Sequence, residues 1–386
     1  MSEIKVNSIK GVAASTAAIT VNNTDGTCTA NLTNRTNKNL IINGAMQVAQ
    51  RGSSVAVSDG SNEGYQSLDR YKTYTNNSGA YTVSQDTDVP TDYSFGRFKK
   101  SYKVDVTTAD TSIGSSDLIR VEQDIEAQDI GSSGWDYSSS SGKITLSFWV
   151  KSVKAGTYVV VIQTVDGTAY SYAIEYTLSA NTWTHVSKTI PGNSNLTIDD
   201  DNGAGLKIHW ILCSGSDNNL TADTWTSGLK YGTTNQANLF DSTSNNWYLT
   251  GVQLEVGSVA TDFEHKCYQE ELYRCYRYYY RYTVPTSNSW VWMGQSNGSD
   301  KVWGKIRDFP VLMRATPTCS ISGSSFYPIG QNQSVGGHST FDTFNFNNTT
   351  TEKLYATWSG SAGIDTDAVV VFANTVTDYF DASAEL

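Results

Sequence analysis

The residues of this chain that are best suited to chemistry are aromatic side chains in polar, loop-like surroundings. A sugar ring presents an apolar C–H face that stacks on an exposed aromatic ring, while its hydroxyls bond to Asn, Asp and Gln. Loops rich in Tyr, Trp, Ser, Gly and Asn suit recognition for the same reason as antibody loops. This composition predicts glycan binding, and the candidate residues are Trp135, Trp225, Tyr231, Trp290, Trp292 and Trp303. Packing in a core or between chains is the alternative for each ring.

Patterns for enzymatic chemistry are absent from the sequence. The four histidines form no HExxH motif, and no two of them are spaced i,i+4. No GxSxG, Walker A or GxGxxG pattern occurs. Acidic pairs such as Glu122 with Glu126, or Asp199 with Asp201, could serve a glycosidase only across a common cleft, and acidic residues are too frequent for spacing to decide. We therefore expect no enzyme and no catalytic residue.

Metal sites are also not indicated. His265, Cys267 and Cys275 superficially resemble a zinc set, but a fourth ligand is missing. The run Ile198–Asn202, IDDDN, could hold Ca²⁺ through its oxygens, although it lacks the Gly and the terminal Glu of an EF-hand, and an exposed turn is the alternative. We expect no metal and no cofactor, with a structural Ca²⁺ left open. The five cysteines are scattered and odd in number, which favours free, buried thiols kept in a reducing cytosol over a disulfide framework.

The charge of the chain narrows its possible partners. The net charge is −11 and the pI about 4.8, which disfavours nucleic-acid binding because phosphate neutralisation needs clustered Lys and Arg. The same charge disfavours docking on anionic membranes. The opening residues hold no apolar run typical of a signal peptide, and no stretch approaches a membrane span. We expect neither a nucleic-acid partner nor membrane insertion.

The elements that must position the candidate rings are short strands. The composition is rich in aromatic residues at 12%, and Ser, Thr, Asn and Gly are frequent, which is typical of β-proteins with polar loops. Alternation in Lys143–Ser152 predicts a half-buried strand, with Ile144, Leu146, Phe148 and Val150 on one face and Thr145, Ser147 and Trp149 on the other. Asp166-Gly167 predicts a hairpin turn. Similar runs are Leu40–Ile42, Arg70–Thr75, Tyr81–Gln85, Ser101–Val106, Leu118–Asp124, Thr157–Thr164, Ser171–Thr177, Thr184–Ile190, Leu206–Cys213 and Trp247–Val256. We expect a jelly-roll sandwich of about eight to ten strands.

The rest of the chain divides into three further parts. Gln269–Tyr282 can form two to three helical turns, and its dense tyrosines suggest packing between domains or between chains. The last hundred residues show further strand patterns, at Trp290–Met293, Val302–Ile306, Thr318–Ser322, Phe341–Phe346, Lys353–Trp358, Ala368–Ala373 and Thr377–Asp381. Within the sandwich, Gly215–Asn246 is a long polar stretch that we expect to be anchored by Trp225, Leu229, Tyr231, Leu239 and Phe240.

The segment Trp247–Tyr282, WYLTGVQLEVGSVATDFEHKCYQEELYRCYRYYYRY, resembles a known family. It is similar to the closing jelly-roll strand and linker helix of tail-fibre-like virion proteins of bacteriophages, especially marine podoviruses. Asp262 stands where that group usually has Pro, so the turn there is expected to be less rigid. The resemblance extends to Asn39–Arg51, Ser147–Lys151 with Gly156–Tyr158, Phe309–Thr318 and Ala384–Leu386. None of these motifs is catalytic, so function follows from them only by analogy.

The expected fold is mostly β: a jelly-roll sandwich, a short linker helix and a smaller C-terminal β module, preceded by an extended N-terminal segment. The expected domains are residues 1–37, which intertwine in a trimer, anchor to the particle or form a disordered tail; 38–265, the sandwich; 266–284, the Tyr-rich linker helix; and 285–386, the C-terminal module and receptor-binding tip.

The resemblance implies a homotrimeric tail fibre that binds a host-surface glycan, resides in the virion and is assembled in the host cytoplasm. Its implied partners are sister chains and, through residues 1–37, other tail or capsid proteins. A capsid-surface or tail-assembly accessory protein is the first alternative. A polysaccharide depolymerase is the second, although the long β-helical repeats of such enzymes are not visible in the sequence.

Overall fold

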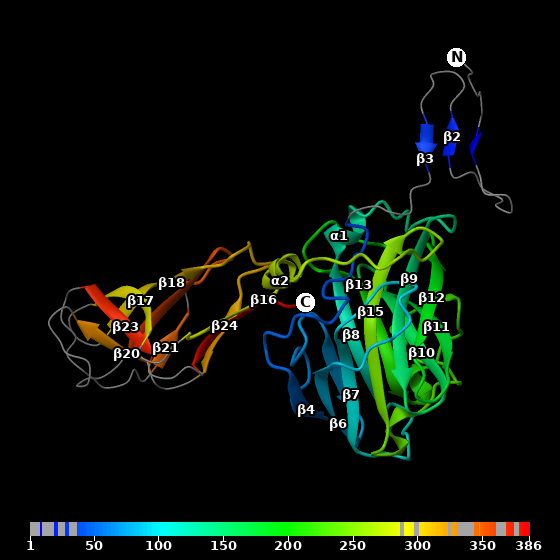
Figure 1. The fold of residues 1–386 in the computed structure, drawn as a ribbon, viewed down its shortest axis with the longest axis horizontal. Coiled ribbons are helices and arrows are strands. Elements are labelled where there is room, and N and C mark those ends of the chain that lie inside the picture. The colour runs from blue at the N-terminus through cyan, green and yellow to red at the C-terminus, as the bar shows by residue number, and fades with distance from the viewer. Residues whose placement is uncertain are drawn as a thin grey trace.

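The described part of the chain is mostly β-sheet, as the sequence predicts. The computed structural model describes residues 8–9, 19–21, 28–30, 37–285, 289–296, 301–322, 326–330, 343–346, 348–359, 368–373 and 378–386. Two six-stranded sheets form a sandwich, and smaller sheets follow it toward the C-terminus (Figure 1). The expectation of a mostly β fold with few helices is confirmed.

Both sheets of the sandwich are antiparallel in every strand pairing between their named strands. The first sheet has the order β14-β11-β10-β13-β8-β5, and the second has the order β12-β9-β15-β7-β6-β4. The first contains β5 (Lys72–Asn76), β8 (Leu118–Glu126), β10 (Gly156–Thr164), β11 (Tyr170–Leu178), β13 (Ala204–Ser214) and β14 (Trp225–Ser227). The second contains β4 (Ser54–Ser58), β6 (Ala80–Asp86), β7 (Ser101–Thr108), β9 (Lys143–Ser152), β12 (Thr184–Pro191) and β15 (Asn246–Val256).

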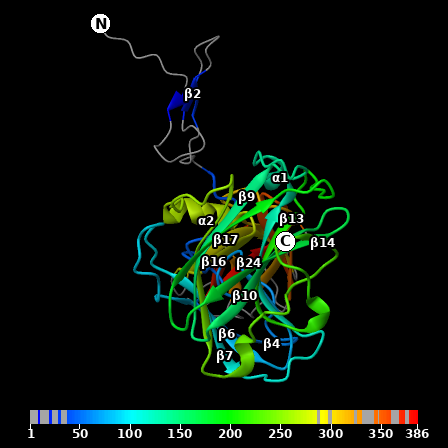
Figure 2. The same ribbon diagram turned by 90° about the vertical axis from the view of Figure 1, so that its right-hand side faces the viewer.

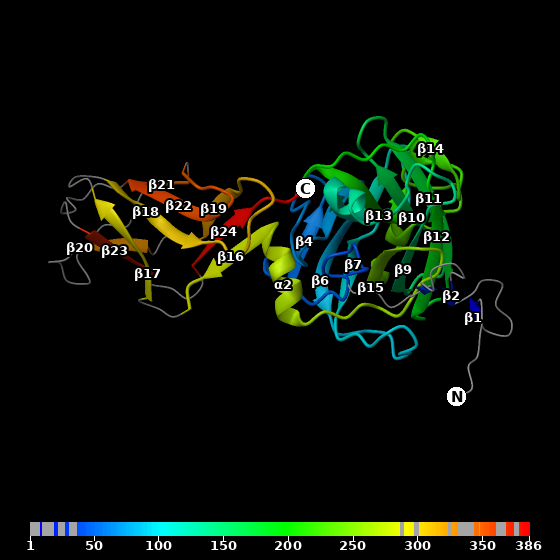
Figure 3. The same ribbon diagram turned by 90° about the horizontal axis from the view of Figure 1, so that it is seen from above.

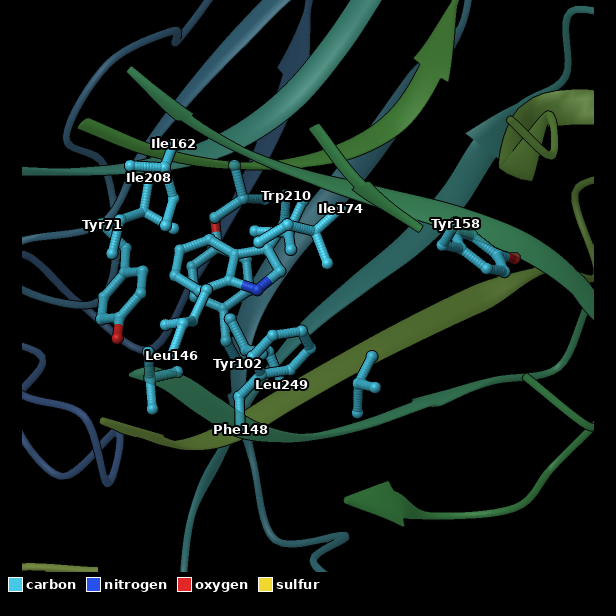
Figure 4. Close-up of a cluster of buried hydrophobic side chains, with 14 of the residues drawn as sticks. Tyr71, Tyr102, Leu146, Phe148, Tyr158, Ile162, Ile174, Ile208, Trp210 and Leu249 are labelled. Carbon is cyan, nitrogen blue, oxygen red and sulfur yellow. The ribbon is translucent and has the colours of Figure 1, made fainter. Parts of the chain in front are cut away.

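The core fills the space between the two sheets because alternate residues of each strand point inward. Trp210 of β13 is fully buried at its centre, and its ring centroid lies 6.1 Å from that of Tyr71 and 6.0 Å from that of Phe148 (Figure 4). The predicted inner face of β9, from Ile144 to Val150, belongs to this core. The Asp166-Gly167 hairpin is confirmed, because β10 and β11 pair from Gly156 with Leu178 to Thr164 with Tyr170.

Three local predictions in the sandwich are wrong. Leu40–Ile42 is not a strand. Its backbone nevertheless contacts β15, because the Leu40 N–H donates to the Leu254 carbonyl at 3.0 Å. The prediction of eight to ten strands missed β4 and β14, which are short edge strands with weak alternation. The outer face of β9 is not half-exposed: Trp149 is 4% exposed because it packs with Phe98 of a covering loop.

The predicted linker helix is shorter than expected. A five-residue helix, α1 (Ala127–Gly131), follows β8, and α2 spans Tyr268–Tyr276. The predicted helix at Gln269–Tyr282 ends early, since Tyr279–Thr283 forms strand β16 and pairs with β24 (Tyr379–Ser383). Tyrosines fit a pleated surface well, so a partner strand from the far end of the chain overrides the local helical pattern.

The C-terminal sheets continue from the linker and extend away from the sandwich (Figures 1 and 3). One described sheet has the order β16-β24-β19 and the other β20-β23-β17-β18-β22-β21. Their strands are β17 (Ser289–Ser296), β18 (Lys301–Asp308), β19 (Thr318–Ser322), β20 (Phe326–Gly330), β21 (Thr343–Asn345), β22 (Lys353–Ser359) and β23 (Ala368–Ala373), besides β16 and β24. The structure thus adds β20 to the predicted strands and begins β24 at Tyr379. The predicted Phe341–Phe346 strand is confirmed over Thr343–Asn345, which forms β21, while residues 341 and 342 lie outside the described residues.

The tyrosines after α2 pack between the sandwich and the C-terminal sheets. Arg277 donates from Nε and Nη2 to the two carboxylate oxygens of Glu126, both at 2.7 Å. Tyr278 donates to the same carboxylate at 2.5 Å, and its ring lies beneath the guanidinium of Arg70, 3.5 Å away. Burial alone would raise the pKa of Glu126, but its bonds to Arg277 and Tyr278 hold that pKa below its usual value. The motif therefore packs between parts of one chain, while its packing between chains stays a prediction.

Glu385 closes this junction from the far end of the chain. Its carboxylate pairs with Arg70, which is 1% exposed, and with Arg51 Nη2 at 3.0 Å. Arg314 adds bonds from its guanidinium to the carbonyls of Ala384 and Glu385, at 2.7 and 2.8 Å. We name Arg51, Arg70, Tyr278 and Glu385 the junction clamp, because they join the sandwich, the linker and the last residues.

Short strands precede the sandwich. The described pieces β1 (Ser8–Ile9), β2 (Ile19–Val21) and β3 (Cys28–Ala30) form a three-stranded sheet that stands apart from the sandwich (Figure 2). None of the helices that the structure describes could cross a membrane. The division at residues 37, 265 and 284 stays a prediction.

Candidate functional site

The outer face of the first sheet carries a dense group of polar and aromatic side chains. Register pairs Tyr74 of β5 with Arg120 of β8, and Lys72 with Glu122. Because residues two apart on a strand share a face, these four side chains lie on the side away from the core. We name Tyr74, Arg120 and Tyr231, with the charged residues beside them, the β5–β8–β13 face.

The centre of this face is an arginine between two aromatic rings. The Arg120 guanidinium carbon lies 4.3 Å from the ring centroid of Tyr74 and 4.5 Å from that of Tyr231. Each ring face attracts the cation, so the stack holds both tyrosines in defined orientations. Tyr74 is 38% exposed, which leaves part of its ring available to a ligand.

The stack rests on a network built around one buried carboxylate. Glu122 is 1% exposed and accepts from Arg120 Nε at 2.8 Å. Its other oxygen lies 2.9 Å from the ammonium of Lys72 and 3.4 Å from that of Lys207. His209 Nδ1 lies 3.1 Å from Glu122 Oε2. This network fixes Arg120 from below while the two rings hold it from the sides.

A second buried carboxylate and an amide complete the network. Asp124 Oδ2 lies 2.6 Å from Lys72 Nζ and 3.3 Å from Lys207 Nζ. The Nε2 atom of His209 lies 2.9 Å from Gln163 Oε1, on the neighbouring strand. Asp124 thus contacts two lysines, and His209 contacts both Glu122 and Gln163. These contacts limit the motion of the side chains before any ligand binds.

The charge states follow from burial and neighbours. Burial would by itself raise the pKa of Glu122, but the His209 bond and the Arg120 and Lys72 cations hold it well below its usual value. Burial, and then Glu122 beside it, raise the pKa of Asp124 to about 6. Burial lowers the pKa of His209 to about 4. At pH 7 both carboxylates are therefore ionised, while the His209 ring is neutral.

The long polar stretch Gly215–Asn246 brings Tyr231 to this face. The Tyr231 N–H donates to the Asn218 carbonyl at 3.0 Å, and its ring lies edge-on to His209 with centroids 5.4 Å apart. Leu239 and Phe240 are fully buried, as expected of anchors. Leu229 is 52% exposed, so its prediction as an anchor is wrong.

The predicted aromatic candidates do not gather in one place. Trp135 is 4% exposed in the sandwich core, so it has no free ring face and we leave it out of the site. Trp225 is half-buried at the sheet edge, where its Nε1 donates to the Pro191 carbonyl at 2.7 Å. Trp292 is 6% exposed in a C-terminal core and Trp303 is 36% exposed. The side chain of Trp290 lies outside the described residues.

Sequence reasoning found Tyr231 but missed Tyr74 and Arg120. The alternation in KTYTN and LIRVEQD could have placed them on outward faces. It could not have shown that the two segments pair, since β5 and β8 are joined by more than forty residues that include other strands. No local signal indicates that Tyr231 lies over β8.

The opposite face of the sandwich carries a smaller group of similar chemistry. Lys151 Nζ lies 4.4 Å from the ring centroid of Tyr248 and pairs with Asp88. Trp183 is 6.1 Å from Tyr248 between centroids, and its Nε1 donates to Asp88 at 3.0 Å. Tyr248 is 8% exposed, so this group offers less free ring surface than Tyr74.

The three residues that superficially resemble a zinc site, His265, Cys267 and Cys275, differ in their surroundings and exposure. His265 packs its ring against Phe98 and Phe263, with centroids 5.4 and 4.9 Å away. Cys275 is buried, while Cys267 is exposed. Among the described residues, no group of three or more His, Cys, Asp or Glu side chains could hold an ion.

Comparisons with known proteins found matches only among solved structures. No family model matches the chain, and no curated protein matches it. A structure titled as a study of CBM4 has a TM-score of 0.29 at 13% identity, covering 56% of this chain and 98% of its own. The N-terminal cellulose-binding domain of Cellulomonas fimi β-1,4-glucanase C has a TM-score of 0.28 at 12% identity, with coverage of 55% and 100%.

A putative sugar-binding protein from Bacteroides thetaiotaomicron is a third such match. Its TM-score is 0.28 at 11% identity, with coverage of 57% of this chain and 100% of its own. Because all these TM-scores and identities are low, the matches establish neither a family nor a ligand for this chain.

Proposed function

We propose that this chain is a non-enzymatic glycan-binding protein and that it binds through the β5–β8–β13 face. The observation that carries the proposal is the Arg120 guanidinium held between Tyr74 and Tyr231. A partly exposed ring beside fixed hydrogen-bonding charges suits a sugar, whose C–H face stacks and whose hydroxyls accept and donate. The network is built before the ligand arrives, which reduces the ordering cost of binding.

Substitution of Tyr74 by Ala tests this proposal. We expect glycan affinity to fall about two- to tenfold, since an aromatic contact contributes roughly 0.5–1.5 kcal/mol and 1.4 kcal/mol corresponds to tenfold. Binding would be screened on an array of bacterial envelope oligosaccharides, and the best ligand titrated by calorimetry. Tyr93→Ala is the matched control, because Tyr93 is a 57% exposed tyrosine on the loop between β6 and β7.

The two variants must differ for the proposal to stand. Equal affinities of the Tyr74 and Tyr93 variants would place the glycan elsewhere. An array with no bound glycan at all would remove the proposed function. Release of reducing sugar from an envelope polysaccharide would instead revive the depolymerase alternative.

The biological setting that we propose is the bacteriophage particle, with the chain as a homotrimeric tail fibre that contacts a host-surface glycan. This rests on the resemblance of Trp247–Tyr282 to tail-fibre-like virion proteins. In this setting residues 1–37 join the trimer to other tail or capsid proteins, and the chain is assembled in the host cytoplasm. Three copies of a weak site would gain avidity on a cell surface.

Light scattering of the purified chain, with and without residues 1–37, tests the trimer. We expect a mass of about three times 42.1 kDa for the full chain. A monomer in both forms would contradict the trimer and favour the capsid-surface or tail-assembly alternative. A trimer only with residues 1–37 would assign the assembly to that segment.

A further inference from the structure

A polar cleft of about 490 Å³ lies at the junction between the sandwich and the C-terminal sheets. Arg51 and Tyr65 line it from the sandwich, Tyr279 and Arg281 from β16, and Ser320 from β19. This volume falls within the usual range for small-molecule sites, and sites of this kind often occur between domains. Tyr74, Arg120 and Tyr231 do not line this cleft, although Lys72 Nζ of the β5–β8–β13 face lies 5.6 Å from the ring centroid of Tyr65 at its side.

The cleft contains a buried guanidinium that the described residues leave partly unpaired. The Arg51 side chain is 9% exposed, and its Nη2 pairs with Glu385 at 3.0 Å. Its Nη1 is buried and has no hydrogen-bond partner among the residues that the structure describes. A buried donor without a partner is costly, so an acceptor from a ligand would find a favourable position there.

The second arginine of the cleft is already satisfied. Arg281 donates from Nε and Nη2 to Asp381 at 2.7 and 2.8 Å, and from Nη1 to the Arg51 carbonyl at 3.2 Å. Its guanidinium lies 3.8 Å from the ring centroid of Tyr379. Asp381 and Glu385 are each engaged by arginine, so among the described residues Arg51 Nη1 is the buried guanidinium nitrogen of this cleft without a hydrogen-bond partner. The Arg51 guanidinium carbon lies 3.5 Å from the ring centroid of Tyr279, which holds the group at the wall of the cleft.

The remaining lining suits a sugar more than a bare anion. The hydroxyls of Ser320 and Ser383 line the cleft, and no hydrogen bond from either side chain is found among the described residues. Aromatic rings of Tyr65 and Tyr379 line it as well. Hydroxyl groups beside flat rings match the alternating polar edges and apolar face of a pyranose.

We propose that this cleft binds an acidic sugar residue, with its carboxylate on Arg51 Nη1 and its hydroxyls on the serine side. Arginine prefers planar carboxylates, and a charge-assisted bond in a partly buried site is stronger than a neutral one. Since the cleft is lined by both the sandwich and the C-terminal sheets, an occupant would also hold the two parts together. The inference does not depend on the proposed Tyr74 site.

Calorimetric titration of the full chain with sodium glucuronate, glucose and sodium acetate tests the inference. We expect glucuronate to bind at least about tenfold more tightly than either of the others, because only glucuronate combines the carboxylate with the ring. Equal binding of glucuronate and glucose would overturn the role of Arg51. Equal binding of acetate and glucuronate would show that the sugar ring does not contribute to binding. No binding of glucuronate would show that the cleft is not an acidic-sugar site.

Two variants locate the binding. Ser320→Trp should fill the cleft from an exposed position on the edge strand β19 and weaken glucuronate binding about tenfold or more. Glu352→Trp, at an exposed position just before strand β22 and outside the lining, is its control. Arg51→Lys keeps the charge beside Glu385 and removes the second guanidinium nitrogen, so it should also weaken binding.

The Tyr74→Ala variant separates this site from the proposed function. Glucuronate binding should be unchanged in that variant if the cleft is the site. Loss of glucuronate binding in Tyr74→Ala, with retention in Ser320→Trp, would assign the acidic sugar to the β5–β8–β13 face and overturn the inference.

Discussion

Replacement of Glu385 by Ala is expected to lower the free energy of unfolding by about 3–5 kcal/mol, the cost of removing one partner from a buried ion pair. The reason is the junction clamp. Arg70 is 1% exposed and Arg51 9% exposed, and both pair with this carboxylate. Without it, two guanidinium groups stay in a site with little access to water. Arg70 would keep the Asp124 carbonyl, 2.6 Å from its Nη2, and the Tyr278 ring.

Urea denaturation followed by tryptophan fluorescence measures this effect. Glu352→Ala is the control, because Glu352 is an exposed glutamate before strand β22, and surface changes of this kind usually stay within about 0.5 kcal/mol. Small-angle scattering on the folded Glu385 variant should show a broader range of distances between the sandwich and the C-terminal sheets. A denaturation midpoint no lower than that of the Glu352 variant would show that the clamp does not hold the junction.

Replacement of Trp210 by Ala is expected to destabilise the sandwich by a similar amount, about 3–5 kcal/mol. Trp210 is fully buried at the centre of the core, between Tyr71 and Phe148 (Figure 4). Its removal leaves a large cavity that strands fixed by ladder hydrogen bonds cannot close. The loss should appear as a lower midpoint with an unchanged denaturant slope.

Trp210→Phe separates packing from hydrogen bonding. The indole Nε1 is buried and has no hydrogen-bond partner among the described residues, so Phe removes an unsatisfied donor while keeping most of the ring contacts. We expect this variant to lose no more than about 1.5 kcal/mol. A loss as large as that of Trp210→Ala would mean that the part of the indole that Phe lacks, and not the ring volume common to both side chains, stabilises the core.

The β-strands could be read from the sequence because strand alternation is local. Ile144 to Val150 were predicted to share one face of β9, and they share the core. The turn at Asp166-Gly167 was also local, since Gly167 adopts a φ of 60° that a glycine accommodates readily. The predicted helix was only partly correct, because whether Tyr279–Thr283 coils or extends depends on β24, which lies a hundred residues later.

The chemical type of the candidate site could be predicted from the sequence, but its location in the fold could not. Aromatic side chains in a polar sequence indicated a recognition surface, yet Trp135 is buried and Tyr74, which was not predicted, is 38% exposed. A ring is available or hidden according to what packs on it, and the covering loop can come from anywhere in the chain. The same holds for Arg120, which meets Tyr231 only because Gly215–Asn246 folds back over β8.

The β-rich class, most of the strands and the short helix after β15 could be predicted from the amino-acid order, because each depends on neighbours along the chain. The positions of Tyr278 beneath Arg70, of Glu385 at the junction and of Arg51 beside a cleft became visible only in the folded chain. Those contacts join residues up to 334 positions apart. Charge pairing and burial over such separations follow from the packing of whole sheets, which no local pattern encodes.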